Sequence, residues 1–128
     1  MRRLKVFRRI FKFHGFGESL KIAFKGIGYL FLFHRNMRII FLCGITAVLA
    51  GVYFNLKGIE LVALCITITL VFMAEIFNTA IEMMIDMSTS KYHPLIKLVK
   101  DIAASVVLIA SLNSLGVGFI LFWRHLFK

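Results

Sequence analysis

The chain consists of long apolar tracts separated by short polar segments. Residues 39–54 and 102–123 contain no charged side chain, and residues 61–81 are interrupted only by Glu75 and Asn78. About 20 helical residues are needed to cross the roughly 30 Å hydrocarbon core of a bilayer. The pattern therefore predicts three membrane-spanning helices, the first of them short enough to need residues from its flanks.

The first 33 residues follow a different pattern, with apolar positions recurring every three or four residues opposite basic ones. This spacing predicts two helices, over residues 1–13 and 18–33, separated at "HGFG". Such amphipathic basic helices are typical of segments that lie on a membrane surface. For residues 1–13 a disordered basic tail is the alternative. The apolar faces comprise Leu4, Phe7, Ile10 and Phe11, then Leu20, Phe24, Ile27 and Phe31.

Composition and charge support a membrane protein and give it an orientation. The chain is 60% hydrophobic with a mean hydropathy of +0.89, which excludes an ordinary soluble domain. Of its 16 basic residues, ten precede residue 39 and three more lie between the second and third spans. The positive-inside rule then places the N-terminus and the second loop in the cytoplasm. The net charge of +10 is better explained by anionic lipid than by a nucleic-acid partner.

The sequence thus predicts an all-α integral membrane protein with three transmembrane helices preceded by amphipathic interfacial helices. Residues 1–33 form the interfacial region and residues 34–128 the three-helix part of one functional unit.

The polar residues of the second span fall on one face. At 100° per residue, Glu75, Asn78, Glu82 and Asp86 share a narrow stripe at its cytoplasmic half. A charge in hydrocarbon costs about 2.5–3.5 kcal/mol on insertion scales, so these groups should face protein, water, metal or substrate. A stripe that only joins helices by hydrogen bonds is the alternative, but it fits a lone asparagine better than three carboxylates.

The stripe predicts a cation site and a general base. Carboxylates near a membrane surface suit Mg²⁺, because this ion is commonly bound by carboxylate oxygens together with nucleotide phosphates. Glu75 lies deepest among apolar neighbours and suits a base acting on a lipid hydroxyl. Lys100 and Asp101, which follow the helix-opening Pro94, return to the same face and suit phosphate or nucleotide binding.

Two motifs resemble the prokaryotic diacylglycerol kinase family, which includes undecaprenol kinases. They are "EIFNTAIEMMID" in the second span and "KYHPLIKLVKDIAAS" at the entry to the third, and the likeness runs from about Ser19 to the end of the third span. The resemblance implies a homotrimer in the bacterial inner membrane with its active site on the cytoplasmic side. It also implies transfer of the γ-phosphoryl of Mg-ATP to a membrane lipid alcohol, either undecaprenol or diacylglycerol.

The resemblance also implies roles for single residues. Glu75 corresponds to the catalytic base, Asn78 to a residue that positions the reacting groups, and Glu82 to a metal ligand. His93 is expected at the helix entry beside Pro94 and not in catalysis. The remaining matches lie around the nucleotide and comprise Asp86, Lys100 and Asp101, together with Lys25 in the surface-helix segment that approaches the phosphates.

One position departs from the family pattern. Family members carry a glutamate of the metal site immediately before "RN", whereas this chain has His34 in "FHRNMR". Imidazole is a poor ligand for Mg²⁺ and a better one for softer metals. His34 is therefore a doubtful metal ligand. Four alternatives are open for His34. It contacts a phosphate, or it leaves the metal to Glu82 and Glu18. Otherwise it marks weakened or altered activity, or it is a surface histidine with no role.

Two other classes of function compete with the kinase. A catalytically inert membrane subunit or lipid-binding protein derived from the family is supported only by His34. A transporter is favoured less, because three helices with polar groups at one face offer no continuous path for an ion.

Overall fold

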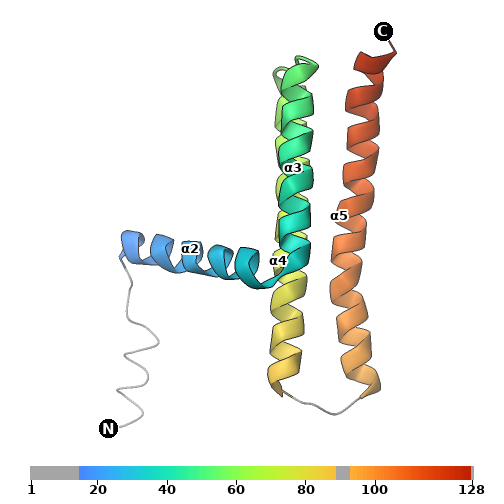
Figure 1. Cartoon of the computed structure of the whole chain (residues 1–128). Coiled ribbons are helices and arrows are strands. Elements are labelled where there is room, and N and C mark those ends of the chain that lie inside the picture. The colour runs from blue at the N-terminus through green and yellow to red at the C-terminus, as the bar shows by residue number, and fades with distance from the viewer. Residues whose placement is uncertain (1–14, 89–92, 128) are drawn as a thin grey trace. The chain divides into compact units, whose positions relative to one another are not determined.

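The computed structural model describes residues 15–88 and 93–127, which form four helices and no strand. They are α2 (Phe16–Phe33), α3 (Arg35–Tyr53), α4 (Ile59–Ser88) and α5 (Pro94–Leu126). Figure 1 shows them in chain order. The prediction of an all-helical chain is confirmed for these residues, whereas the surface helix predicted over residues 1–13 lies outside them.

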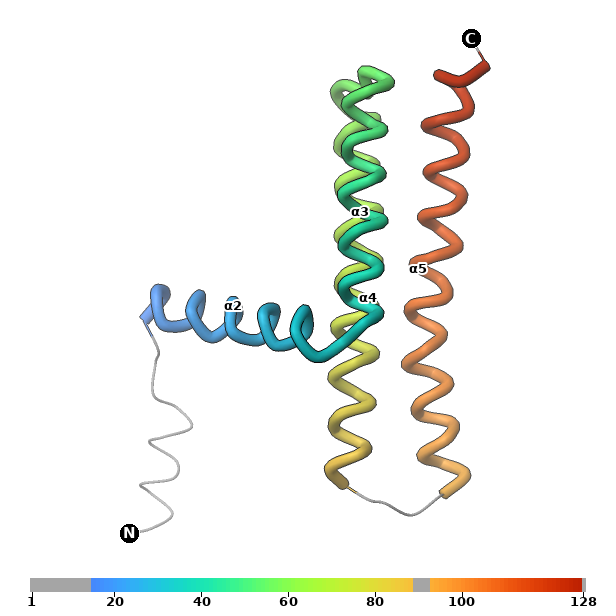
Figure 2. Tube along the Cα trace, viewed as in Figure 1, coloured from blue at the N-terminus to red at the C-terminus, as the bar shows by residue number. Residues whose placement is uncertain are grey.

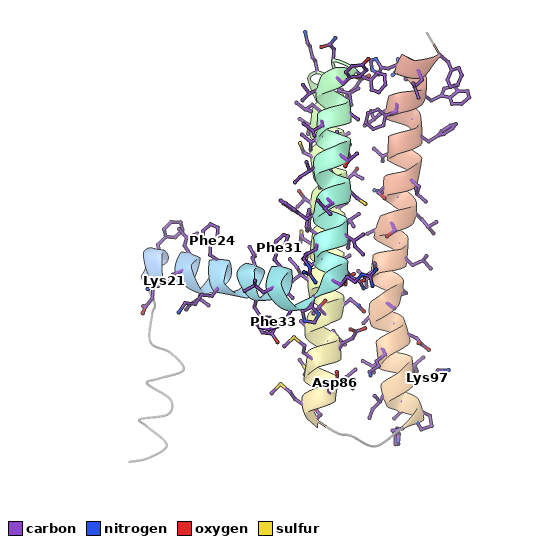
Figure 3. All side chains as sticks on the ribbon, viewed as in Figure 1. Lys21, Phe24, Phe31, Phe33, Asp86 and Lys97 are labelled. Carbon is purple, nitrogen blue, oxygen red and sulfur yellow. The ribbon has the colours of Figure 1, made fainter. Side chains whose placement is uncertain are left out.

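The chain separates into two compact units, Met1–His34 and Arg35–Lys128. In the first unit, α2 begins after Gly15, whose carbonyl oxygen accepts hydrogen bonds from the backbone N–H groups of Glu18 and Ser19 at 3.0 Å each. Phe24 and Phe31 project from one side of α2 and Phe33 from the other (Figure 3). The location of this helix at a membrane surface remains a prediction.

The second unit contains the three predicted spans, and α3, α4 and α5 are each long and apolar enough to cross a membrane. Each helix is longer than its charge-free tract: α3 begins at Arg35, α4 continues to Ser88, and α5 starts at Pro94. The difference arises because a helix satisfies its backbone internally whatever its side chains are. The charge-free tract marks the hydrocarbon layer, and the helix continues beyond it.

Helix α4 lies at the centre of the second unit and packs against both α3 and α5. Figure 2 shows that neighbouring helices run in opposite directions and that α4 and α5 extend beyond the start of α3. Figure 3 shows Asp86 and Lys97 on this extension, which we call the basic end.

The contact between α3 and α4 fixes the depth of Glu75. The rings of Phe41 and Phe72 meet edge to face, with centroids 6.2 Å apart. Because the helices are antiparallel, Arg38, three residues before Phe41, is level with Glu75, three residues after Phe72. An exposed arginine avoids the hydrocarbon interior, so Glu75 lies near the membrane boundary at the basic end.

Charged contacts join α4 and α5 at both of their ends. At one end Glu60 lies 3.2 Å from His125 and 3.9 Å from Arg124. At the other end Lys100 Nζ lies 3.5 Å from Asp86 Oδ1. The 26 residues from Glu60 to Asp86 span about 39 Å. Because Glu75 lies near the membrane boundary, Asp86, about 16 Å further along α4, and its partner Lys100 lie beyond the hydrocarbon layer.

A buried apolar cluster of Leu56, Leu64 and Leu121 lies near the Glu60 end. Asn55 and Gly58, with φ of 58° and 62°, make the turn that leads from α3 into α4. Gly51 is buried against this cluster, and a Cβ added to it would lie 3.0 Å from Leu64 Cδ2 and 3.3 Å from Leu56 Cδ1. A side chain here would require Leu64 and Leu56 to shift by a few tenths of an ångström.

We expect Gly51→Val to lower the free energy of unfolding by about 1–3 kcal/mol, because the new methyl groups would overpack this cluster. Gly116→Val is the matched control, since nothing lies within 4 Å of a Cβ added there. Denaturant unfolding in mixed micelles measures the free energy of unfolding of both variants and of the wild type. Equal losses would show that the close approach at Gly51 has no energetic importance.

Candidate active site

Helix α4 carries the four residues of the polar stripe, and their exposure rises toward the basic end. Glu75 is 5% exposed, and Asn78, one turn further, is half-buried. Glu82 is exposed, and the Asp86 side chain is 72% exposed. One helix face thus leads from a buried carboxylate to exposed ones.

Asn78 links the inner and outer parts of the stripe. Its amide Nδ2 donates to Glu82 Oε1 at 3.4 Å, which orients the Glu82 carboxylate. The Asn78 Oδ1 atom is buried and has no hydrogen-bond partner among the described residues. A buried carbonyl oxygen in this state is costly.

Helix α5 adds one of its two predicted charged residues to the stripe. Lys100 contacts Asp86, although both side chains are largely exposed, at 44% and 72%. Asp101 is also exposed but makes no contact with the stripe among the described residues. Consecutive residues point about 100° apart on a helix, which explains why only one of them faces α4.

The entry to α5 is fixed by His93 and Pro94. The His93 ring Nδ1 accepts a hydrogen bond from the Leu95 N–H at 3.1 Å, and Pro94 occupies the first turn. Proline is favoured there because the N–H it lacks would have no helical partner. The predicted helix-entry role of His93 is confirmed, and it sets the position of Lys100 at the end of the second turn of α5.

Two predicted site residues belong to the first unit. Lys25 is an exposed residue of α2. His34 ends α2, where its backbone N–H donates to the Leu30 carbonyl oxygen at 2.9 Å and its ring centroid lies 6.0 Å from that of Tyr29. Their participation in a site with the stripe remains a prediction.

The described residues of a single chain contain no cluster of three or more histidine, cysteine or acidic side chains. Glu82 and Asp86, one turn apart on α4, nevertheless fit Mg²⁺, because this ion is commonly held by one or two carboxylates together with substrate phosphates and water. A closed all-protein cage is not required for such a site.

An apolar groove that the sequence analysis missed lies between α3, α4 and α5. Its volume is about 300 Å³, and Gly44, Ala47 and Gly118 are among its lining residues. On α4 the lining residues Ile68 and Val71 precede Glu75 by seven and four positions, so they share its face. The groove therefore runs from the Glu75 region toward the membrane interior. The small residues Gly44 and Ala47 on α3 and Gly118 on α5 were the feature of the sequence that could have indicated this groove.

Comparison with known proteins identifies the family. The model of the prokaryotic diacylglycerol kinase family matches residues 21–122. A diacylglycerol kinase of Synechocystis is 36% identical over 101 residues, which cover 78% of this chain and 58% of that protein. The undecaprenol kinase of Bacillus subtilis is 32% identical over 107 residues, covering 84% of this chain and 87% of the relative. The diacylglycerol kinase of Escherichia coli is 31% identical over 114 residues, covering 87% and 93%.

These relatives are bacterial lipid kinases, in keeping with the three spans. The predicted resemblance is confirmed, and with it the assignment of a membrane-bound lipid kinase. The chain belongs to the prokaryotic diacylglycerol kinase family.

Proposed function

We propose that this kinase transfers the γ-phosphoryl group of Mg-ATP to the hydroxyl of a membrane lipid alcohol, undecaprenol or diacylglycerol. The observation that carries the proposal is the exposure gradient along α4, from Glu75 at 5% to Asp86 at 72% for its side chain. A lipid hydroxyl reaches the site from the membrane and a nucleotide reaches it from water, and the stripe joins the two environments.

Each residue of the stripe has a task in this reaction. Glu75 accepts the proton of the lipid hydroxyl. The hydroxyl oxygen then bonds to the γ-phosphorus, and the bond between this phosphorus and the oxygen of the leaving ADP breaks. Asn78 holds the Glu82 carboxylate in place beside the reacting groups. Glu82 and Asp86 would hold Mg²⁺, which supplies charge compensation on the phosphates.

Charged residues around the polar stripe bind the nucleotide. Lys100 lies beside Asp86 on the water-exposed part of the stripe, where it suits the phosphates. Lys25, from α2, is proposed to approach the same phosphates, and Asp101 to contact the rest of the nucleotide. Positioning and charge compensation of this kind need no phosphate-binding loop.

The hydrocarbon tail of the acceptor occupies the apolar groove in this proposal. The groove continues the Glu75 face of α4 into the membrane, so a tail lying in it brings the attached hydroxyl to Glu75. Its volume of about 300 Å³ is within the range of ligand pockets. A tail in the groove also excludes water from the base.

The proposed setting is a homotrimer in the bacterial inner membrane, with the basic end in the cytoplasm. Arg35, Arg38, Lys97 and Lys100 all lie at that end, in agreement with the positive-inside rule. Cytoplasmic ATP then reaches the exposed part of the stripe directly.

Lipid phosphorylation tests the function directly. We expect the purified full chain in mixed micelles, supplied with Mg²⁺ and labelled ATP, to phosphorylate undecaprenol or diacylglycerol. Each lipid is supplied separately, which identifies the acceptor. An assembled protein that labels neither lipid would favour the inert-subunit interpretation and overturn the proposal.

Variants of the buried Glu75 and of the exposed Glu82 separate the roles of these two residues. We expect Glu75→Gln to lower kcat by about 10²–10⁴-fold with nucleotide affinity little changed, because it removes the base. Glu82→Gln should mainly weaken Mg²⁺-dependent nucleotide binding, measured by titration. Glu60→Gln, at the far end of the same helix, is the control and should retain activity. Reversed effects of the first two variants would contradict the assigned roles.

Filling the groove should weaken binding of the lipid alone. Gly118 lines the groove and has nothing within 4 Å of an added Cβ, so leucine there enters the open space. We expect Gly118→Leu to raise the KM for lipid about tenfold or more and to leave the KM for ATP unchanged. Gly116→Leu, two residues away on the other side of α5 and equally open, is the matched control. Equal effects of the two variants would exclude the groove as the tail site.

A further inference from the structure

Thr79 is a buried polar residue of α4 to which the proposed reaction gives no task. It is 3% exposed. Its hydroxyl makes no hydrogen bond within residues 15–88 and 93–127. The other threonines of the spans donate, at 2.8–2.9 Å, to the carbonyl oxygen four residues earlier in their own helix; they are Thr46, Thr67 and Thr69. Thr79 therefore carries a buried donor that its own helix does not use.

Thr79 lies beside the polar stripe, between the proposed base and the proposed metal ligands. It follows Glu75 by four residues, so it lies about 40° around α4 and about 6 Å along it, toward the basic end. Glu82 is three residues further on. Side chains three or four residues apart are neighbours on a helix surface. The Thr79 hydroxyl is therefore flanked by both carboxylates on one face of α4.

The proposed reaction brings the γ-phosphoryl group to the level of Thr79. The lipid hydroxyl meets Glu75, and the nucleotide reaches the site from the exposed part of α4, where Glu82 lies. Reacting atoms lie about 3–3.5 Å apart before a bond forms, so the γ-phosphorus must come this close to the hydroxyl oxygen. It then lies between the levels of Glu75 and Glu82, as Thr79 does.

The burial of Thr79 is compatible with a contact to substrate. Glu75, its neighbour one turn away, is buried to a similar degree at 5% exposed. A complex that brings the lipid hydroxyl to Glu75 therefore uncovers the adjacent Thr79 as well.

We propose that the Thr79 hydroxyl donates a hydrogen bond to an oxygen of the γ-phosphoryl group of bound ATP and so holds this group in line with the lipid hydroxyl. The inference rests on the proposed function and adds a substrate-binding residue to its site. Phosphoryl oxygens are strong, negatively charged acceptors and satisfy such a buried donor. A hydroxyl also suits a position between two carboxylates, because it brings a donor without a charge that would compete with Mg²⁺ for them.

The test compares two nucleotides that differ in the γ-phosphoryl group, ADP and a β,γ-methylene analogue of ATP. Their affinities for the full chain are measured by titration in mixed micelles with Mg²⁺. We expect Thr79→Val, which removes the hydroxyl and keeps the branched shape, to weaken binding of the analogue about tenfold or more, because a hydrogen bond to a charged group is lost. Binding of ADP should not change.

Two further variants isolate the hydroxyl. Thr79→Ser keeps it and should bind the analogue about as tightly as the wild type does. Thr69→Val is the matched control on the same helix, because the hydroxyl of Thr69 is already bonded to the Cys65 carbonyl oxygen at 2.8 Å. It should leave both affinities unchanged. In the lipid kinase assay, Thr79→Val should lower kcat/KM for ATP about tenfold or more and leave the KM for lipid unchanged.

The proposal is overturned by a wild type that binds the two nucleotides equally, by a Thr79→Val variant that keeps the wild-type preference for the analogue, or by one that loses affinity for both nucleotides alike, as a purely structural role would produce. A serine variant that binds the analogue no better than the valine variant would also overturn it. Circular dichroism checks helical content, and Thr79→Ala replaces the valine variant if that variant loses helicity.

The lipid kinase assay on the same samples separates this inference from the proposed function. A wild type that phosphorylates neither lipid, while its preference for the analogue depends on Thr79, would refute the proposed function alone. An active wild type whose preference for the analogue ignores Thr79 would refute this inference alone.

Discussion

The free-energy cost of a carboxylate in hydrocarbon is the constraint on which the whole site depends. Glu75 is buried within a helix that crosses the membrane, and a charge in the hydrocarbon costs about 2.5–3.5 kcal/mol on insertion scales. The structure limits this cost by placing Glu75 level with Arg38, near the membrane boundary, with its stripe continuing into water. An acid at this depth can meet a lipid hydroxyl while its neighbours along the helix meet a nucleotide.

In the proposed function, one helix therefore serves as both core and catalytic scaffold. The face of α4 that carries Glu75 is apolar in the membrane, where Ile68 and Val71 line the groove, and acidic beyond it. The side chains on this face change from apolar to acidic where the surroundings of the helix change from hydrocarbon to water. A rigid 30-residue helix held at both ends by ion pairs keeps the two halves in register, which a loop-based site would do less well.

The sequence predicts the features that depend on periodicity and charge. The three spans, the acidic stripe and the helix entry at His93 follow from the 3.6-residue repeat, the absence of charge and the preference of proline for a first turn. The helix ends are predicted less well, because helices continue past the hydrocarbon layer at no cost to the backbone. Asp101 illustrates a further limit, since two adjacent charged residues cannot both face α4 and only the register of α4 and α5 selects Lys100.

The groove along the Glu75 face of α4 depends on features that a linear pattern does not contain. Gly44, Ala47 and Gly118 are far apart in the chain and become neighbours of one space only when three helices pack.

The most direct measurement is a structure of the assembled protein in a lipid bilayer with Mg²⁺, a non-hydrolysable ATP analogue and the lipid alcohol bound. The account requires a Glu75 oxygen within about 2.6–3.2 Å of the lipid hydroxyl, with the phosphates beside Glu82 and Asp86. A Glu75 carboxylate turned toward the lipid tails, or a nucleotide bound away from this face of α4, would contradict it.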